Sequence, residues 1–468
     1  MPETSGTPVR IVDASLYFLP VEMRVPLKFG NQTLSSVTCA RTKITVMGVD
    51  GTTAVGWGET PLSVGWVWPS SIDYENRHTA LKDFTILLAK EIENYPIAGH
   101  PVELGYSFIE GPLENLRNKF NETRAPEEAL PHLAALVCFS LFDIAIHDGF
   151  GQLFNCPVYS TYDKDYLPVE LSQFLEPATD TVSFDGKYLS DYLEPSPPEK
   201  LPVWHLVGGL DPISEDDLTG SEPDDGYPVL LREWIREDGL DCLKIKLRGN
   251  DQPWDIDRLL KIGEICREEN VTWLTTDFNC TVTDPAYVNE ILDQLKIDDP
   301  VTYQKILYVE QPFPYDLEAN RIDVHSVSSR KPLFMDESAH DWKYVRTGRD
   351  LGWTGVALKT CKTQTGALLS GAWAKAHGMT LMVQDLTNPM LAQVPHFLLA
   401  ANIGTIMGVE SNGMQFYPEA SAPEREIHPG LYRRRNGILD GSTLSNTGFG
   451  YRVDEIQRTL PSPVYGNG

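Results

Sequence analysis

Between residues 243 and 360, five short apolar runs each end in a charged residue, and each precedes a stretch with a helical pattern. The runs are Leu-Lys-Ile-Lys-Leu (243–247), Thr-Asp-Phe-Asn (276–279), Val-Glu-Gln-Pro (309–312), Met-Asp-Glu-Ser (335–338) and Ala-Leu-Lys-Thr (357–360). They recur at intervals of about 25 to 35 residues, as a repeated strand–helix unit requires. Such units close a parallel barrel whose strand ends meet at one rim, so these charged residues are expected to share one pocket.

The barrel is predicted to have eight strands joined by seven helices. The strands are predicted at 201–207, 241–247, 272–277, 305–310, 332–336, 354–359, 380–384 and 404–409. The helices are predicted at 228–238, 254–269, 284–297, 316–328, 341–349, 363–377 and 389–401. The fold class is therefore α/β, with a modified TIM barrel of the (β/α)₇β type.

At 468 residues the chain exceeds the usual size of a single core, which favours more than one domain. Residues 10–60 alternate as in β-hairpins, and 76–95 and 131–154 have a helical period, so residues 1–156 are expected to form an α+β capping domain. Residues 157–200 form an acidic, proline-rich insertion or connection. The barrel is placed at 201–415, and residues 416–468 are expected to return to the cap.

Two loops of the capping domain, Arg24–Ser35 and Thr60–Ser70, are polar and contain glycine. The second loop holds Trp66 and Trp68. Tryptophans in a loop more often cover another part of the protein than stand free in water, although local packing explains them equally well.

Composition excludes several classes of partner. The net charge of −27 argues against nucleic acid and anionic membranes as partners. No apolar run is predicted to span a bilayer, and residues 1–9 lack the apolar core of a signal peptide, so a cytoplasmic location is expected. The seven cysteines are odd in number and scattered, which indicates reduced thiols and no zinc ribbon: Cys39, Cys138, Cys156, Cys242, Cys266, Cys280 and Cys361.

Three acids, Asp277, Glu310 and Asp336, stand at the ends of three consecutive predicted strands. Each alone is explained as a polar strand end, but three at matching positions are not. Hard oxygen ligands with no histidine or cysteine suit Mg²⁺. Asn279 and Gln311 lie beside the first two acids and are expected to orient them.

Lys244 and Lys246 are two residues apart on one predicted strand, so both side chains face the barrel interior. Interior positions are normally apolar, and buried lysines need opposite charge nearby. Lys359 ends the sixth strand, across the barrel. Amines on opposite walls with a metal between them suit removal and delivery of a proton on two faces of one carbon, with the pKa of a crowded lysine lowered toward neutrality.

These residues resemble the successive strand-end motifs of the enolase superfamily, and best its muconate lactonizing enzyme subgroup. The barrel motifs are Lys244-x-Lys246, Asp277-x-Asn279, Glu310-Gln-Pro, Asp336-Glu-Ser and Leu358-Lys359-x-x-Lys362. Outside the barrel, the similar motifs are Gly56-Trp-Gly58-Glu59, Asp143-Ile-Ala-Ile-His-Asp148 and Thr447-Gly-Phe-Gly450. The resemblance covers nearly the whole chain apart from 157–200.

The resemblance implies a magnesium-dependent lyase or isomerase that removes a proton next to a carboxylate and stabilises the enediolate. Lys246 and Lys359 would be the acid/base pair, Lys244 would lower the proton affinity of Lys246, and the three acids would bind Mg²⁺. The loops Arg24–Ser35 and Thr60–Ser70 would close on a small carboxylate substrate. Glu337, Lys362, His205 and Asp385 are further candidates for lining the pocket, and an even-numbered homo-oligomer is expected.

The chain departs from two subgroups. Val383-Gln-Asp-Leu at the seventh strand offers no histidine base of the mandelate racemase kind, and Val409-Glu-Ser-Asn412 lacks the Asp-x-Asp of dipeptide epimerases. Cycloisomerisation, epimerisation and dehydration stay open. Two alternatives also stay open: a Schiff-base aldolase that uses a desolvated lysine, and a non-catalytic relative that serves as a binding protein.

Overall fold

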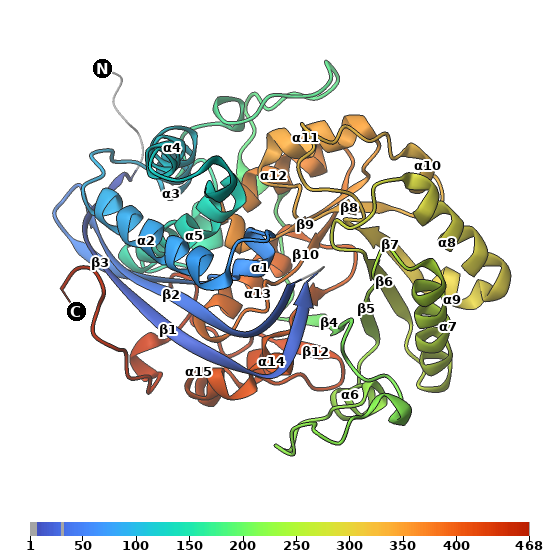
Figure 1. Ribbon diagram of the computed structural model, residues 1–468. Coiled ribbons are helices and arrows are strands. Elements are labelled where there is room, and N and C mark those ends of the chain that lie inside the picture. Colours follow the sequence, from blue (N-terminus) through green and yellow to red (C-terminus); the bar gives the residue numbers. More distant parts are fainter. Residues whose placement is uncertain (1–6, 30–31, 468) are drawn as a thin grey trace.

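A computed structural model describes residues 7–29 and 32–467 of the chain. A three-stranded antiparallel sheet opens the fold: β1 (Val9–Phe29), β2 (Gln32–Gly48) and β3 (Thr53–Pro61), in that order. Helices α2 (Tyr74–Glu93) and α5 (His132–Leu153) pack against this sheet, as the helical periods predict (Figure 1). The shorter α3 (Pro101–Phe108) and α4 (Glu114–Asn121), which the sequence analysis did not predict, lie between them in the chain.

The prediction of a loop at 24–35 is wrong for the described residues. Strands β1 and β2 continue through it, with Leu27 opposite Leu34 and a register shift between Glu22 and Leu27. Residues 21, 23, 25 and 27 are apolar and alternate with polar ones, which is a strand pattern that Pro26 obscures. Gly30 and Asn31 lie outside the described residues.

Helix α5 is the core helix of the capping region. The segment Pro126–Leu153 is long and apolar enough to cross a membrane, contrary to the sequence expectation, but 83% of its most apolar window is buried inside the protein. Two glycines of β3 allow the strand to approach it: a Cβ on Gly56 would lie 2.1 Å from the carbonyl oxygen of Ala145, and one on Gly58 would lie 1.9 Å from that of Leu141. The absence of side chains at these two glycines therefore sets the distance between β3 and α5.

Eight parallel strands curl into the barrel (Figure 1). They are β4 (Lys200–Val207), β5 (Cys242–Lys246), β6 (Trp273–Asp277), β7 (Ile306–Glu310), β8 (Leu333–Met335), β9 (Gly355–Leu358), β10 (Thr380–Val383) and β11 (Val409–Glu410). β11 pairs with β4, and a hydrogen bond from the Ile406 amide to the Leu381 carbonyl links its approach to β10. The short antiparallel β12 (Ile438–Asp440) also pairs with β4.

A helix follows each of the first seven barrel strands. These helices are α6 (Leu231–Asp238), α7 (Gln252–Glu268), α8 (Pro285–Asp298), α10 (His325–Ser328), α11 (Trp342–Leu351), α12 (Gln364–Ala376) and α13 (Gln393–Ile403). The (β/α)₇β prediction is confirmed. The expected helix at 316–328 is reduced to the single turn of α10, the strand at 404–409 to two residues, and α9 (Pro300–Lys305) was not predicted.

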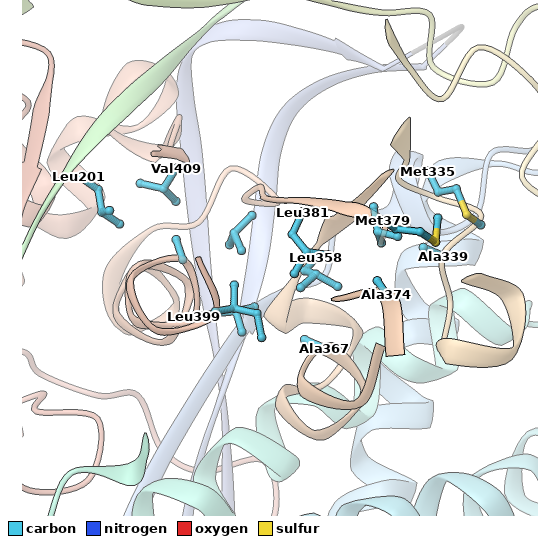
Figure 2. Close-up of a cluster of buried hydrophobic side chains, with 14 of the residues drawn as sticks. Leu201, Met335, Ala339, Leu358, Ala367, Ala374, Met379, Leu381, Leu399 and Val409 are labelled. Carbon is cyan, nitrogen blue, oxygen red and sulfur yellow. The ribbon is translucent and has the colours of Figure 1, made fainter. Parts of the chain in front are cut away.

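Apolar side chains fill two layers of the barrel. Figure 2 shows part of the outer layer, where Leu358 and Leu381 of the strands meet Ala367 of α12 and Leu399 of α13. Inside the barrel, Tyr308 stacks on Phe334 with ring centroids 4.2 Å apart. These aromatic rings lie below the polar strand ends and close that end of the pocket.

Residues 157–200 are not a surface decoration. Leu171 and Phe174 of this segment belong to the main hydrophobic core. The indole nitrogen of Trp373 in α12 donates to the Glu176 carbonyl, and Lys375 donates to the Tyr192 carbonyl. The segment therefore covers the outside of α12.

Candidate active site

The two lysines of β5 point into the barrel, as the sequence predicts. β5 is paired on both edges, and Lys246 lies opposite Asp277 of β6, which lies opposite Glu310 of β7. Lys244 and Lys246 are 3% and 5% exposed. Parallel pairing in register thus brings one amine and two carboxylates from three neighbouring strands to one level of the barrel, with Lys244 two residues earlier on β5.

Lys244 lies at the centre of the acids. Its Nζ is 2.6 Å from Glu310 Oε1, 3.0 Å from Glu410 Oε2 and 3.1 Å from Asp277 Oδ2. The ammonium group of Lys246 donates a short hydrogen bond to the same Asp277 oxygen. All five charged groups of this set are buried, so each one needs the others for compensation.

Asp336 and Lys359 form the opposite side of the site. Lys359 Nζ is 3.2 Å from Asp336 Oδ2 and donates to the Asp385 carbonyl at 3.0 Å. Lys362 Nζ donates to the backbone carbonyl of Asp336 at 2.6 Å and lies 3.6 Å from its Oδ1. Amines therefore flank the buried acids on both sides, Lys246 on one and Lys359 on the other.

Burial and the neighbouring charges set the pKa values in this site. Burial lowers the pKa of Lys244 and Lys359, but the carboxylates around each raise it above its ordinary value overall. Burial and Asp277 raise the pKa of Glu310 well above its usual range. For Lys359, the carboxylates Asp336, Glu410 and Glu310 outweigh both burial and the neighbouring Lys244, which act to lower its pKa.

Two amides hold the acids in place. The backbone N–H of Asn279 donates to Asp277 Oδ1 at 2.8 Å. Gln311 Oε1 accepts from the Asp336 amide at 2.8 Å and from the amide and hydroxyl of Ser338. Asn279 and Gln311 both have positive φ, 47° and 29°, a conformation that is uncommon outside glycine and that turns the chain sharply after each strand.

The tryptophan loop covers the site from the capping region. Trp66 lies in the single turn α1 (Val64–Val67) and is 5% exposed. Its ring centroid is 5.4 Å from Lys359 Nζ and 5.9 Å from Lys362 Nζ. The predicted role of this loop as a cover over the barrel mouth is consistent with these contacts.

Three other candidates lie differently. Glu337 is buried beside Asp336, and burial together with Asp336 raises its pKa to about 7. The Asp385 carboxylate accepts from the Asn412 and Asn388 amides, so it braces two loops. His205 faces outward from β4 and packs on Trp234 of α6, 5.5 Å between ring centroids, away from the lysines.

The sequence analysis missed two participants, Glu410 and Gln384. Glu410 Oε1 accepts from the Asn412 side chain at 2.7 Å while its other oxygen binds Lys244. Gln384 donates to Glu310 and to the Tyr308 hydroxyl, and its carbonyl lies 3.4 Å from both Lys244 and Lys359. Both residues end a barrel strand, which is the signal that marked the other acids.

The residue types fit magnesium, but in this structure lysine ammonium groups pair with the three acids that would bind the ion. Asp277, Glu310 and Asp336 supply buried oxygen ligands, and Asp336 Oδ1 has no hydrogen-bond partner among the described residues. Within residues 7–29 and 32–467, however, no three His, Cys, Asp or Glu side chains are placed to share one ion. The expected convergence of the three acids requires the Lys244 ammonium to leave Asp277 and Glu310.

Comparison with known proteins agrees with this architecture. Residues 228–457 match the family model described as enolase C-terminal domain-like. The matched segment covers most of the barrel, which in this respect is similar to the enolase superfamily. No curated protein sequence matches the chain.

Solved structures of this superfamily share the fold over nearly the whole chain. A dipeptide epimerase from Enterococcus faecalis, complexed with Mg and L-Leu-L-Tyr, has 17% identity and a TM-score of 0.60, with 94% of this chain and 99% of that chain covered. The N-succinyl Arg/Lys racemase from Bacillus cereus has 18% identity and a TM-score of 0.59, with 98% and 99% covered. Muconate lactonizing enzyme from Pseudomonas fluorescens has 15% identity and a TM-score of 0.58, with 94% and 96% covered.

Proposed function

We propose that this chain is a magnesium-dependent lyase or isomerase of the enolase superfamily that removes the proton next to the carboxylate of a small acid. The observation that carries the proposal is the pair of amines on opposite sides of the buried acids. Lys246 lies against Asp277 of β6, and Lys359 lies against Asp336 after β8. A substrate carbon held between the two walls would present one face to each amine.

Asp277, Glu310 and Asp336 would hold the metal, with Gln311 and Asn279 fixing two of the three. Bound Mg²⁺ would offset the negative charge that keeps Lys359 protonated and would stabilise the charge that develops on the substrate carboxylate as the proton leaves.

The chain's own groups account for the rest of the chemistry. Lys246 and Lys359 would each remove or deliver a proton at their Nζ atoms. Lys244, whose pKa the surrounding carboxylates raise, would stay protonated and, once it has left Asp277 and Glu310, would bind the substrate carboxylate. Trp66 would keep water away from Lys359. The reaction class beyond proton removal is set by the substrate, which the fold alone does not specify.

A screen for α-proton exchange tests this function. A library of small carboxylic acids is incubated with the full chain and Mg²⁺ in deuterated buffer, and deuterium uptake is followed by NMR. We expect exchange that is lost in Lys246→Ala and in Lys359→Ala, and retained in Lys261→Ala, an exposed lysine of α7. Exchange that persists in the Lys246→Ala/Lys359→Ala double variant would overturn the proposal, and borohydride trapping of a carbonyl substrate would favour the aldolase alternative.

A further inference from the structure

A cavity of about 280 Å³ lies on the outer side of β4, apart from the lysines and acids described above. It is lined by residues 24–26 of β1, by helix α6 and by the segment 208–230, which connects β4 to α6 at the edge of the barrel (Figure 1). Most of its wall is apolar: Val25, Pro26, Val207, Leu210, Leu231 and Trp234. Its size approaches that of pockets that bind small molecules.

His205 is a buried polar group in this wall. It is 1% exposed, and its Nδ1 has no hydrogen-bond partner within the described part of the chain. Burial and the nearby Arg434 lower the pKa of His205 well below its ordinary value, so the ring is neutral near pH 7. A neutral imidazole offers one donor and one acceptor, and at Nδ1 that capacity is unused.

Gln415 is a second such group. Its Nε2 donates to the Leu206 carbonyl at 2.8 Å and lies 3.3 Å from Asp211 Oδ2, which fixes the orientation of the amide. Its Oε1 must therefore be an acceptor, and it has no donor among the described residues. Each buried polar atom left without a partner costs roughly 1–3 kcal/mol. His205 Nδ1 and Gln415 Oε1 are both fully covered by neighbouring groups, so a ligand would recover this cost once the cavity wall moves to admit it.

The charges around the cavity select the kind of ligand. Asp211, Asp217 and Glu222 line it, whereas Arg24 is already paired with Asp225 through two hydrogen bonds. An anion is disfavoured there, and a group that donates hydrogen bonds is favoured.

We propose that this cavity binds a small apolar group that carries a hydrogen-bond donor: an amine, an amide or a hydroxyl. The cavity lies apart from the lysines and acids of the proposed proton-transfer site, and its ability to bind such a group can be tested without that function. A smaller hollow that shares Leu210 includes Lys246 and Asn279, so the bound group is either the far end of the substrate or an independent small molecule.

Calorimetric titration of the full chain with benzylamine, benzyl alcohol and benzoate tests the site. We expect the two donors to bind at least about tenfold more tightly than benzoate, and Val229→Trp, which fills the cavity, to weaken them by at least about tenfold. Leu218→Trp, in the same segment but outside the wall, is the matched control. His205→Phe keeps a ring on Trp234 and should weaken both donors by about fivefold or more.

Binding that is equal in Val229→Trp and in the unchanged chain, preference for benzoate, or no binding of any probe would overturn the proposal. Proton exchange of the acid substrate, measured with and without saturating benzylamine, decides the source of the ligand. If benzylamine raises the KM of the acid substrate, the cavity holds the far end of that substrate. If benzylamine leaves the exchange rate unchanged, the cavity binds an independent ligand. Since the titrations need no turnover, they remain decisive if no exchange activity is found.

Discussion

The indole of Trp66 lies over the ammonium group of Lys359, with 5.4 Å between Nζ and the ring centroid. One residue comes from the loop after β3 and the other from the end of β9, so this contact joins the capping region to the barrel at the proposed site. It places an aromatic face on that side of the lysine. The accessibility and the charge of Lys359 therefore depend on the position of the loop Thr60–Ser70.

Replacing Trp66 by Leu is expected to slow the proton exchange at Lys359 by about 5- to 30-fold, since a desolvated cation–π contact is worth roughly 1–2 kcal/mol. The measurement is the exchange rate in deuterated buffer at saturating substrate. Trp68→Leu is the matched control, because Trp68 is equally buried but lies by Arg124. Equal losses in the two variants would mean that the loop acts only through general packing.

Replacing Gln311 by Met should loosen the loop after β8, which carries the proposed metal ligand Asp336, while leaving the acids in place. The change removes the acceptor shared by the Asp336 amide and Ser338. We expect a loss of roughly 1–3 kcal/mol in the free energy of unfolding and a 10- to 100-fold weaker Mg²⁺ affinity. Gln311→Glu keeps an acceptor oxygen and should recover part of the lost stability and part of the lost Mg²⁺ affinity. A Gln311→Met variant with unchanged Mg²⁺ affinity would contradict this role.

Magnesium binding should require all three strand-end acids. We expect Asp277→Asn, Glu310→Gln and Asp336→Asn each to remove the heat of Mg²⁺ binding in calorimetry and the rise of Tm that Mg²⁺ gives the unchanged chain. Asp257→Asn, an exposed acid paired with Lys261, should leave both intact. A full binding heat in Asp336→Asn would show that the ion lies between Asp277 and Glu310 alone.

Gly58→Ala is expected to destabilise the fold severely. The new methyl would lie 1.9 Å from the Leu141 carbonyl oxygen of α5. Because this oxygen belongs to the helix backbone, the clash can be relieved only if β3 moves away from the helix. We expect a loss above about 3 kcal/mol, measured by urea unfolding. Gly111→Ala, which would meet nothing within 4 Å, is the control and should change stability by less than about 1 kcal/mol in either direction.

The sequence identifies the site best where a strand is central in the barrel. The side chains of Lys244 and Lys246 could be predicted to point inward because both faces of a central parallel strand are buried. A charged side chain on such a strand is expected to point into the pocket. Glu410 and Gln384 were missed although strands were predicted beside both, because the predicted eighth strand ended one residue before Glu410 and the side chain of Gln384 carries no charge. His205 was predicted to line the pocket because it lies on a barrel strand, but the side chains of its neighbours Trp204 and Leu206 are the ones that face inward.

The segment 157–200 shows a second limit. Its buried residues, such as Leu171 and Phe174, lie in 3₁₀ turns and bends, so their spacing follows neither a helical nor a strand period. A periodic spacing of apolar residues reveals only the buried face of a regular helix or strand. An irregular segment can be buried just as fully when it packs against a neighbour such as α12. Its acidic composition therefore gave no information about its packing.

The stability of the fold should depend on pH through Asp148. Burial raises the pKa of this carboxyl to about 7, although the amides of Trp57 and Phe449 bonded to it act in the opposite direction. Because the folded-state pKa exceeds the unfolded value, the folded chain binds the proton more tightly. The contribution of this group thus falls as pH rises to about 7, by roughly 1.4 kcal/mol per pH unit, and is constant above.

Urea unfolding of the unchanged chain and of Asp148→Asn between pH 5 and pH 8 measures this effect. The asparagine does not titrate, so the difference between the two free energies of unfolding should change by about 2–3 kcal/mol from pH 5 to pH 7 and then level off. Parallel curves would show that Asp148 stays ionised in the folded state because its two backbone donors outweigh burial. If Asp148→Asn does not fold, the carboxyl carbon shift of Asp148 in the unchanged chain, followed by NMR over the same range, gives the same answer directly.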